Sequence, residues 1–140
     1  MPLIYRSMKV DGGKPLCENT ARGLGVRIGT SPEDDIAADD AGQVHPDSGG
    51  MSVVPSWRDL EAHRIPKRLK HIVTDARGSN RDACWRRGEG PFENGPVADD
   101  LVLRKDSDIH AFVEPARSMS AAAYIQALVA TRDQWIIDED

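Results

Sequence analysis

The chain has little of what marks a disulfide-stabilised, metal-binding or membrane-spanning protein. Its 140 residues include two cysteines, Cys17 and Cys84, which are too few for a disulfide framework and too far apart for a zinc motif. No apolar run approaches the length that crosses a membrane, and the first residues lack the apolar core of a signal peptide. We therefore expect a cytoplasmic chain with no membrane partner, and export by a machinery that reads no signal peptide is compatible with it.

Positive charge is also in deficit. The chain has 18 Lys and Arg against 23 Asp and Glu, which gives a formal net charge of −5. A broad nucleic-acid-binding surface needs an excess of positive charge, so this balance disfavours nucleic acid as a partner. Basic side chains gather between residues 51 and 97, which could face an anion or an acidic partner or could form an ordinary solvated surface.

The remaining composition is that of a folded protein. Hydrophobic residues make up 39% and charged residues 29% of the chain, and the length suits a single domain. Only 5% of the residues are aromatic, so we expect the few aromatic side chains to contribute strongly to the core.

Local patterns predict an α+β fold. Short apolar stretches predict strands at residues 2–10, 23–29, 51–54, 69–73, 84–85, 101–103 and 109–114. Ser56 is a predicted N-cap for a central helix that ends at Ile65, and Ser120 is a predicted N-cap for a C-terminal helix that continues to about Trp135. Residues 30–50 predict a long loop, and the glycine- and arginine-rich residues 77–95 predict a lid or a mobile surface loop.

Two segments suggest a ligand site. Turn-forming residues from His45 to Gly50 lead directly into a short apolar strand that carries Ser52, and Arg6 lies within another predicted strand. A guanidinium and a hydroxyl on adjacent strands suit an anionic ligand that carries a sugar. The acidic residues between 33 and 40 have no ordered ligand spacing, so we predict no metal site.

Several blocks occur in a characteristic order. They are Leu3-Ile4-Tyr5-Arg6, His45-Pro46-Asp47-Ser48-Gly49-Gly50-Met51-Ser52-Val53, His110-Ala111-Phe112-Val113-Glu114-Pro115-Ala116-Arg117-Ser118-Met119, and a final helix that ends in Trp135. This order resembles the small cytotoxic effectors that bacteria deliver through the type VI secretion system, which have a fold similar to the ADP-ribosyltransferase toxins. The resemblance implies one such domain over residues 1–140, with short antiparallel or mixed sheets, a central helix and a C-terminal helix.

The resemblance implies NAD as a substrate and assigns catalysis to Arg6, Ser52 and Glu114. Arg6 would bind the pyrophosphate and Ser52 would orient a ribose. Glu114 would stabilise the positive charge that develops on the ribose when the glycosidic bond breaks. The family usually has a hydroxyl residue where this chain has Met51.

The expected ligand contacts extend beyond these residues, to Tyr5, His45, Gly49, Gly50 and Trp57. The two aromatic side chains would wall the nicotinamide, the glycines would let the backbone approach the ligand, and the imidazole would carry a proton. Each assignment has a structural alternative: aromatic packing in the core, a glycine turn, a loop histidine, an arginine that reaches solvent from an edge strand, or a glutamate in solvent at a strand end.

The resemblance also implies a biological role. The chain would use NAD to modify a macromolecular target in the recipient cytoplasm, or would degrade NAD, and a dedicated immunity protein would neutralise it. A non-catalytic binding protein that acts through a partner surface on the same fold is an alternative. A second alternative is an RNA-directed protein that uses the basic middle of the chain.

Overall fold

The computed structural model describes all 140 residues, and every pairing between its named strands is antiparallel. The strands are β1 (Ile4–Asp11), β2 (Lys14–Pro15), β3 (Gln43–Val44), β4 (Met51–Val53), β5 (Asp82–Arg87), β6 (Gly95–Ala98), β7 (Leu101–Ser107), β8 (His110–Pro115), β9 (Met119–Ser120) and β10 (Ile136–Ile137). They form sheets of order β10-β5-β1-β2, β4-β8-β7-β6 and β3-β9, and one α-helix, α1 (Ala121–Val129), lies near the C-terminus. The expected α+β class is confirmed at this level.

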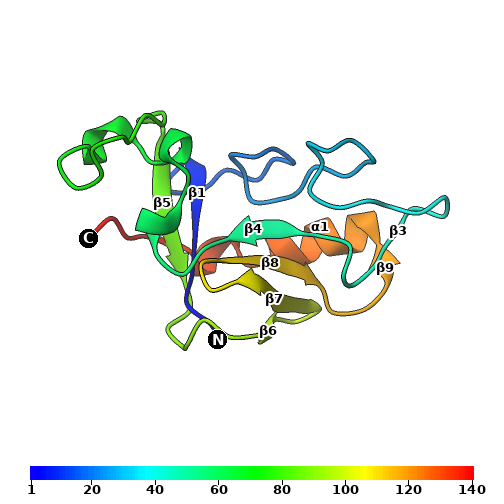
Figure 1. Ribbon diagram of the computed structural model, residues 1–140. Helices are drawn as coiled ribbons and strands as arrows, with labels where there is room; N and C mark the ends of the chain where they lie inside the picture. The colour runs from blue at the N-terminus through cyan, green and yellow to red at the C-terminus, as the bar shows by residue number, and fades with distance from the viewer.

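The two four-stranded sheets are joined where β1 passes the end of β4. Tyr5 donates its N–H to the Val54 carbonyl at 2.8 Å, and Val54 donates back to the Tyr5 carbonyl at 3.0 Å. Figure 1 shows β1 and β5 running steeply across the direction of β4 and β8. The bridge places the beginning of β1 directly beside the end of β4.

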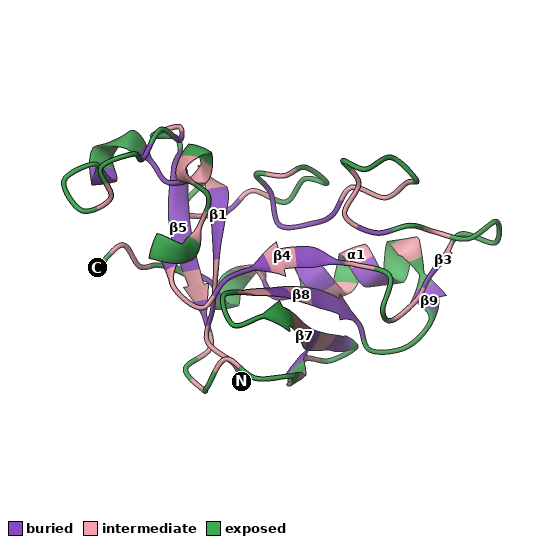
Figure 2. Cartoon of the chain, in the orientation of Figure 1, coloured by how far each residue is buried: buried purple, intermediate pink, exposed green.

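The β4-β8-β7 sheet has one buried face and one open face. Alternate residues such as Met51, Ala111 and Val113 are buried in the main core, whereas Ser52 and Phe112 between them are half-buried on the other side (Figure 2). The buried face packs against α1, whose inner side carries the buried Tyr124 and Leu128.

The cap of α1 is as predicted, but the helix is shorter than the sequence suggested. Ser120 accepts the Ala123 N–H at 3.1 Å through its hydroxyl. The helix ends at Val129 instead of near Trp135, and a 3₁₀ turn, η4 (Arg132–Gln134), follows. The chain is extended again from Trp135, because the β-branched residues of β10 pair with β5.

Three other expectations for local structure were wrong. Residues 23–29 form no named strand, although Leu24 and Val26 are buried, so their alternation reflected burial rather than a ladder of hydrogen bonds. Residues 69–73 form a turn in which Val73 donates its N–H to the Leu69 carbonyl. Residues 77–95 are not a loop, because β5 lies inside that stretch and pairs with β1 in the middle of its sheet.

The central helix is replaced by short 3₁₀ turns, η1 (Trp57–Asp59), η2 (Ala62–Arg64) and η3 (Lys67–Leu69). Ser56 does cap the first of them, accepting the Arg58 N–H at 3.4 Å. Pro66 cannot donate a helical hydrogen bond, and residues Leu60 and Ile65 adopt extended backbone angles, so the turns never merge into one helix.

The 3₁₀ turns cover a small second core, which the last residues of the chain close. Its members are Trp57, Ile65, Leu69, Ala76 and Cys84. Glu139 pairs with Arg68 at 2.6 Å and also accepts the backbone N–H of Cys84 at 3.1 Å. The carbonyl of Asp140 accepts the Trp57 indole N–H at 3.0 Å. The last residues of the chain therefore hold the 3₁₀ turns to β5 and its sheet.

No helix in the structure is both long enough and apolar enough to cross a lipid bilayer.

The Tyr124 hydroxyl connects α1 with the buried face of the β4-β8-β7-β6 sheet. It donates to the Val113 carbonyl and accepts the Met51 N–H at 3.2 Å, and all three groups are buried. We expect Tyr124→Phe to lower the free energy of unfolding by about 1–3 kcal/mol, because the buried Met51 N–H loses its partner. Denaturant unfolding measures this, and an unchanged stability would contradict the bridging role.

Candidate functional site

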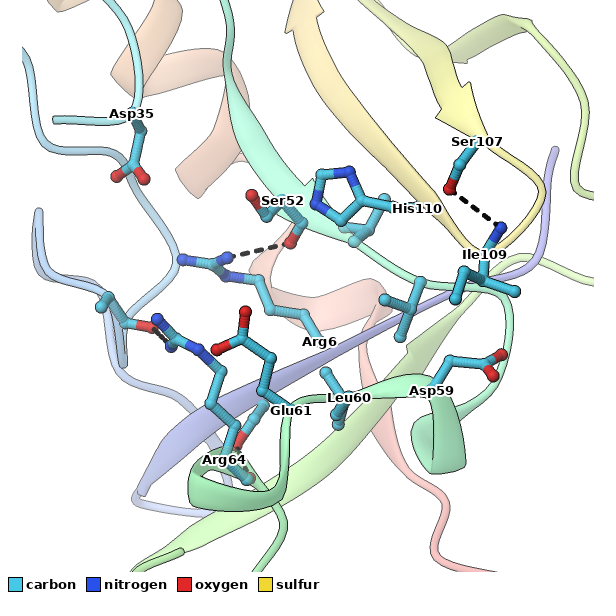
Figure 3. Close-up of a pocket in the computed structure, with 14 residues that line it drawn as sticks. Arg6, Asp35, Ser52, Asp59, Leu60, Glu61, Arg64, Ser107, Ile109 and His110 are labelled. Carbon is cyan, nitrogen blue, oxygen red and sulfur yellow. Dashed lines mark hydrogen bonds between the residues drawn. The ribbon is translucent and has the colours of Figure 1, made fainter. Parts of the chain in front are cut away.

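A cavity of about 330 Å³ lies at the junction of the two large sheets (Figure 3). It is bounded by β1, by β4, by the η1–η2 segment, by the turn between β7 and β8, and by the loop around residue 35. Its polar lining includes Arg6, Asp35, Ser52, Glu61, Arg64 and His110. The volume is at the small end of the range for ligand pockets, so it suits part of a nucleotide rather than a macromolecule.

Arg6 is the best-organised polar group of the cavity. Its side chain comes from the middle of β1, which is a central strand rather than an edge strand, and the residue is only 7% exposed. Nη1 donates to the Ser52 carbonyl at 2.9 Å, and Nε and Nη2 donate to the Gly23 carbonyl at 3.3 and 3.2 Å. A guanidinium has five N–H groups, so two are left for a ligand. Burial lowers the pKa of Arg6 to about 10, and the nearby Asp35 carboxylate opposes that shift.

Ser52 reaches the same cavity from the other sheet. The contact with Arg6 uses the main-chain carbonyl of Ser52, whereas its hydroxyl makes no hydrogen bond within the protein. Strand alternation explains the orientation, because the neighbouring Met51 is buried in the core and pairs with Val113. Met51 therefore faces away from the cavity.

Asp35 is a site residue that sequence reasoning did not single out. Its side chain is 17% exposed, and its Oδ2 accepts the Arg27 N–H at 2.8 Å. The loop approaches the cavity closely because of the paired glycines: the Gly50 N–H donates to the Asp35 carbonyl, and a Cβ on Gly49 would lie 2.3 Å from that oxygen. The glycines thus position an acid near Arg6 and do not line the cavity themselves.

Arg64 brings a second guanidinium to the cavity from η2. Its Nη1 donates to the Ala21 carbonyl at 2.9 Å, and its own carbonyl accepts the Ser7 hydroxyl at 2.7 Å. Figure 3 shows the Arg64 and Arg6 side chains extending in the same direction, with Glu61 between them. No periodic pattern marks Arg64 or Asp35 in the sequence, because Asp35 lies in a loop and Arg64 ends η2, a single 3₁₀ turn that is too short to show a repeat.

Glu114 lies outside the cavity lining. It shares a face of β8 with His110, but four residues of extended chain separate them by about 13 Å. Its carboxylate is buried, pairs with Arg104 at 2.8 Å and accepts the Asp47 N–H at 3.3 Å. The expected glutamate is therefore absent from the lining of the cavity that contains Arg6, and Arg104 engages its carboxylate instead.

The two expected aromatic walls also lie elsewhere. Tyr5 is next to Arg6 in β1 and therefore points to the opposite face, where its hydroxyl donates to Asp138 at 2.8 Å. Trp57 is 1% exposed in the second core. The structural alternative of core packing accounts for Trp57, and neither aromatic side chain lines the cavity.

His45 is likewise separate from the cavity. Its ring contacts Ser118 and Asp39, in the loops that flank the small β3-β9 sheet. Of the residues expected in the site, the structure therefore brings together Arg6 and Ser52, and it adds Asp35, Arg64 and His110.

A scan against protein-family models finds no match to this chain, and a search of curated proteins finds no significant match.

Arg6 contributes to the fold as well as to the cavity. We expect Arg6→Met to lower the free energy of unfolding by about 1–3 kcal/mol, because buried carbonyls of Gly23 and Ser52 lose their donors while the cost of burying a charge disappears. The exposed Arg81 offers a matched control, and Arg81→Met should change stability by less than about 0.5 kcal/mol. Equal stability of the two variants would contradict the structural role of Arg6.

The only two tyrosines of the chain should resist ionisation in the folded protein. Burial, followed by the hydrogen bond to Asp138, raises the pKa of Tyr5 to about 12, and burial raises the pKa of Tyr124 further. The unfolded chain releases these protons near its ordinary pKa of about 10, so stability should be full below about pH 10 and fall as the pH rises toward 12. Tyrosinate absorbance during an alkaline titration measures this, and a folded protein that ionises near pH 10 would contradict it.

Proposed function

We propose that the chain is a cytotoxic effector of the ADP-ribosyltransferase class, which binds NAD in the Arg6 cavity and uses it to modify a target or degrades it. The observation that carries the proposal is the meeting of Arg6 and the free Ser52 hydroxyl, from two different sheets, in one cavity. The two uncommitted N–H groups of Arg6 suit a pyrophosphate oxygen, and a hydroxyl that both donates and accepts suits a ribose. Arg64 adds a second positive charge for the phosphates.

The chemistry of glycosidic cleavage needs a carboxylate near the ribose, because positive charge develops there as nicotinamide leaves. Asp35 supplies one within the cavity, held in place by the Arg27 N–H. We assign to Asp35 the role that the sequence resemblance gave to Glu114.

The open face of the β4-β8-β7-β6 sheet continues beyond the cavity and extends the site. From Ser52 it continues to Phe112, over whose ring the Arg104 guanidinium lies at 5.5 Å, and then to Glu114. The Arg104 guanidinium on this face adds a positive charge that suits a phosphate group. His110 lines the cavity and Glu114 lies four residues further along β8, about 13 Å of extended strand, so this face offers room for more of a ligand than the cavity alone holds.

A non-catalytic binding protein on the same fold is the second candidate. The observation that favours it is the pairing of Asp35 with Arg27, whose Nη2 lies 3.5 Å from Oδ1, because this carboxylate is already engaged by a guanidinium. In either case we propose that the chain acts in the cytoplasm of a recipient cell and that an immunity protein binds it there.

NAD binding tests the proposal directly. In calorimetric titrations of the purified protein with NAD, Ser52→Ala and Arg64→Ala should each weaken binding by about 10-fold, since a charged or ribose hydrogen bond is lost. Arg81→Ala is the matched control, because Arg81 is exposed and lies outside the cavity lining. Absence of NAD binding at millimolar concentration would overturn the proposal.

Turnover then separates the two candidates. Release of nicotinamide, with loss of that release in Asp35→Asn, would support the enzyme. Binding of NAD without release, in a protein that still arrests growth on inducible expression in a bacterium, would support the non-catalytic protein instead.

A further inference from the structure

Three side chains outside the Arg6 cavity form a continuous hydrogen-bonded chain. The Nδ1 atom of His45 lies 2.7 Å from the Ser118 hydroxyl, and its Nε2 atom lies 2.8 Å from Oδ2 of Asp39. A serine, an imidazole and a carboxylate in this order are the components of an activated nucleophile. The three residues come from separate loops, so no local sequence motif contains all of them.

Strand pairing and a turn in the surrounding backbone hold these three side chains close together. Val44 pairs with Met119 in the β3-β9 sheet, and this pairing brings the adjacent residues His45 and Ser118 together. The chain before β3 folds back on itself, because Asp39 donates its N–H to the Gln43 carbonyl at 2.9 Å. The contacts of His45 are therefore a consequence of strand pairing and of a defined turn.

The carboxylate fixes which nitrogen of His45 carries the proton. An ionised carboxylate only accepts hydrogen bonds, so Nε2 must donate to Asp39, and the neutral ring then presents the lone pair of Nδ1 to the Ser118 hydroxyl. The backbone N–H of Gln43, followed by the His45 contact, lowers the pKa of Asp39, so the carboxylate stays ionised. Its other oxygen, Oδ1, accepts the N–H groups of Ala41 and Gln43 at 3.0 and 2.9 Å.

Ser118 precedes Ser120, the N-cap of α1, by two residues and lies just before β9. The N–H of Ser118 donates to no protein atom and remains available to a developing oxyanion.

We propose that Ser118, His45 and Asp39 constitute a second reactive site, independent of the Arg6 cavity, at which Ser118 attacks small esters. The Ser118 oxygen forms a bond to the acyl carbon, the bond from that carbon to the leaving oxygen breaks, and the serine proton passes to Nδ1 of His45 and then to the leaving oxygen. Water reverses the sequence: it adds to the acyl carbon, its proton passes through His45, and Ser118 is regenerated.

The exposure of the group defines the substrates that it can take. The side chains of His45 and Asp39 are 41% and 42% exposed, and Ser118 is exposed as well. An open site of this kind favours small, unhindered acyl or phosphonyl electrophiles over substrates that need an enclosing pocket.

A fluorophosphonate probe tests the proposal on the full-length protein. The Ser118 oxygen would bond to phosphorus, fluoride would leave, and the serine proton would pass to His45, which leaves a stable adduct that peptide mass spectrometry can locate. We expect an adduct on Ser118 in the wild-type protein. His45→Gln should slow its formation by about 100-fold, because glutamine can keep a hydrogen-bonded link between the loops but cannot accept the proton.

Matched variants decide the outcome. Asp39→Asn should slow labelling as well, whereas Ser48→Ala, at an exposed serine of the neighbouring loop, should leave it unchanged. Circular dichroism and thermal melting establish that each variant is folded. The absence of a Ser118 adduct in the wild-type protein, labelling at Ser118 that persists in folded His45→Gln, or an equal rate in urea-unfolded protein would each overturn the proposal. NAD binding is expected to be unaffected in all these variants, so the two proposals can fail separately.

Discussion

The buried guanidinium of Arg6 is the interaction on which the relation between the two large sheets depends. It lies beside the Tyr5–Val54 bridge and links β1 to the carbonyl of Ser52 in β4 and to the carbonyl of Gly23. Burying a charge is unfavourable, as its lowered pKa records, and the carbonyl dipoles compensate for that cost. One side chain thus closes the junction of the sheets and provides the positive charge of the cavity, so the requirements of folding and of ligand binding coincide at this residue.

Sequence patterns predicted the strands whose alternation reflects a sheet with one buried face. The start of the chain and residues 109–114 belong to this class, and the hydroxyl caps at Ser56 and Ser120 were also found correctly. The patterns failed at residues 23–29, where Leu24 and Val26 are buried without a partner strand, and at residues 69–73, where a turn buries Leu69 and leaves Ile72 exposed. Burial and strand pairing produce the same apolar spacing over short stretches, and only contacts distant in sequence distinguish them.

The candidate site was predicted where strands position it and missed where loops do. Arg6 and Ser52 were expected from two predicted strands and from the resemblance, whereas Tyr5, expected beside Arg6, lies on the opposite face of β1 as strand alternation requires. Asp35 lies in a loop and Arg64 in the single turn η2, and neither stretch contains a repeat long enough to relate sequence position to direction in space. The same reasoning applies to Ser118, whose contact with a histidine 73 residues away exists only after β3 and β9 have paired.

One wall of the cavity, the η1–η2 segment, is attached through the small second core and not by strand pairing. The η1–η2 segment, which carries Glu61 and Arg64, rests on this core, and the ion pair of Glu139 helps to hold it to β5. Ionic contacts near the surface weaken as salt rises, whereas the interlocked strands around Arg6 do not depend on them. Part of the attachment of this wall to β5 is therefore ionic, and that part alone is expected to weaken as the salt concentration rises.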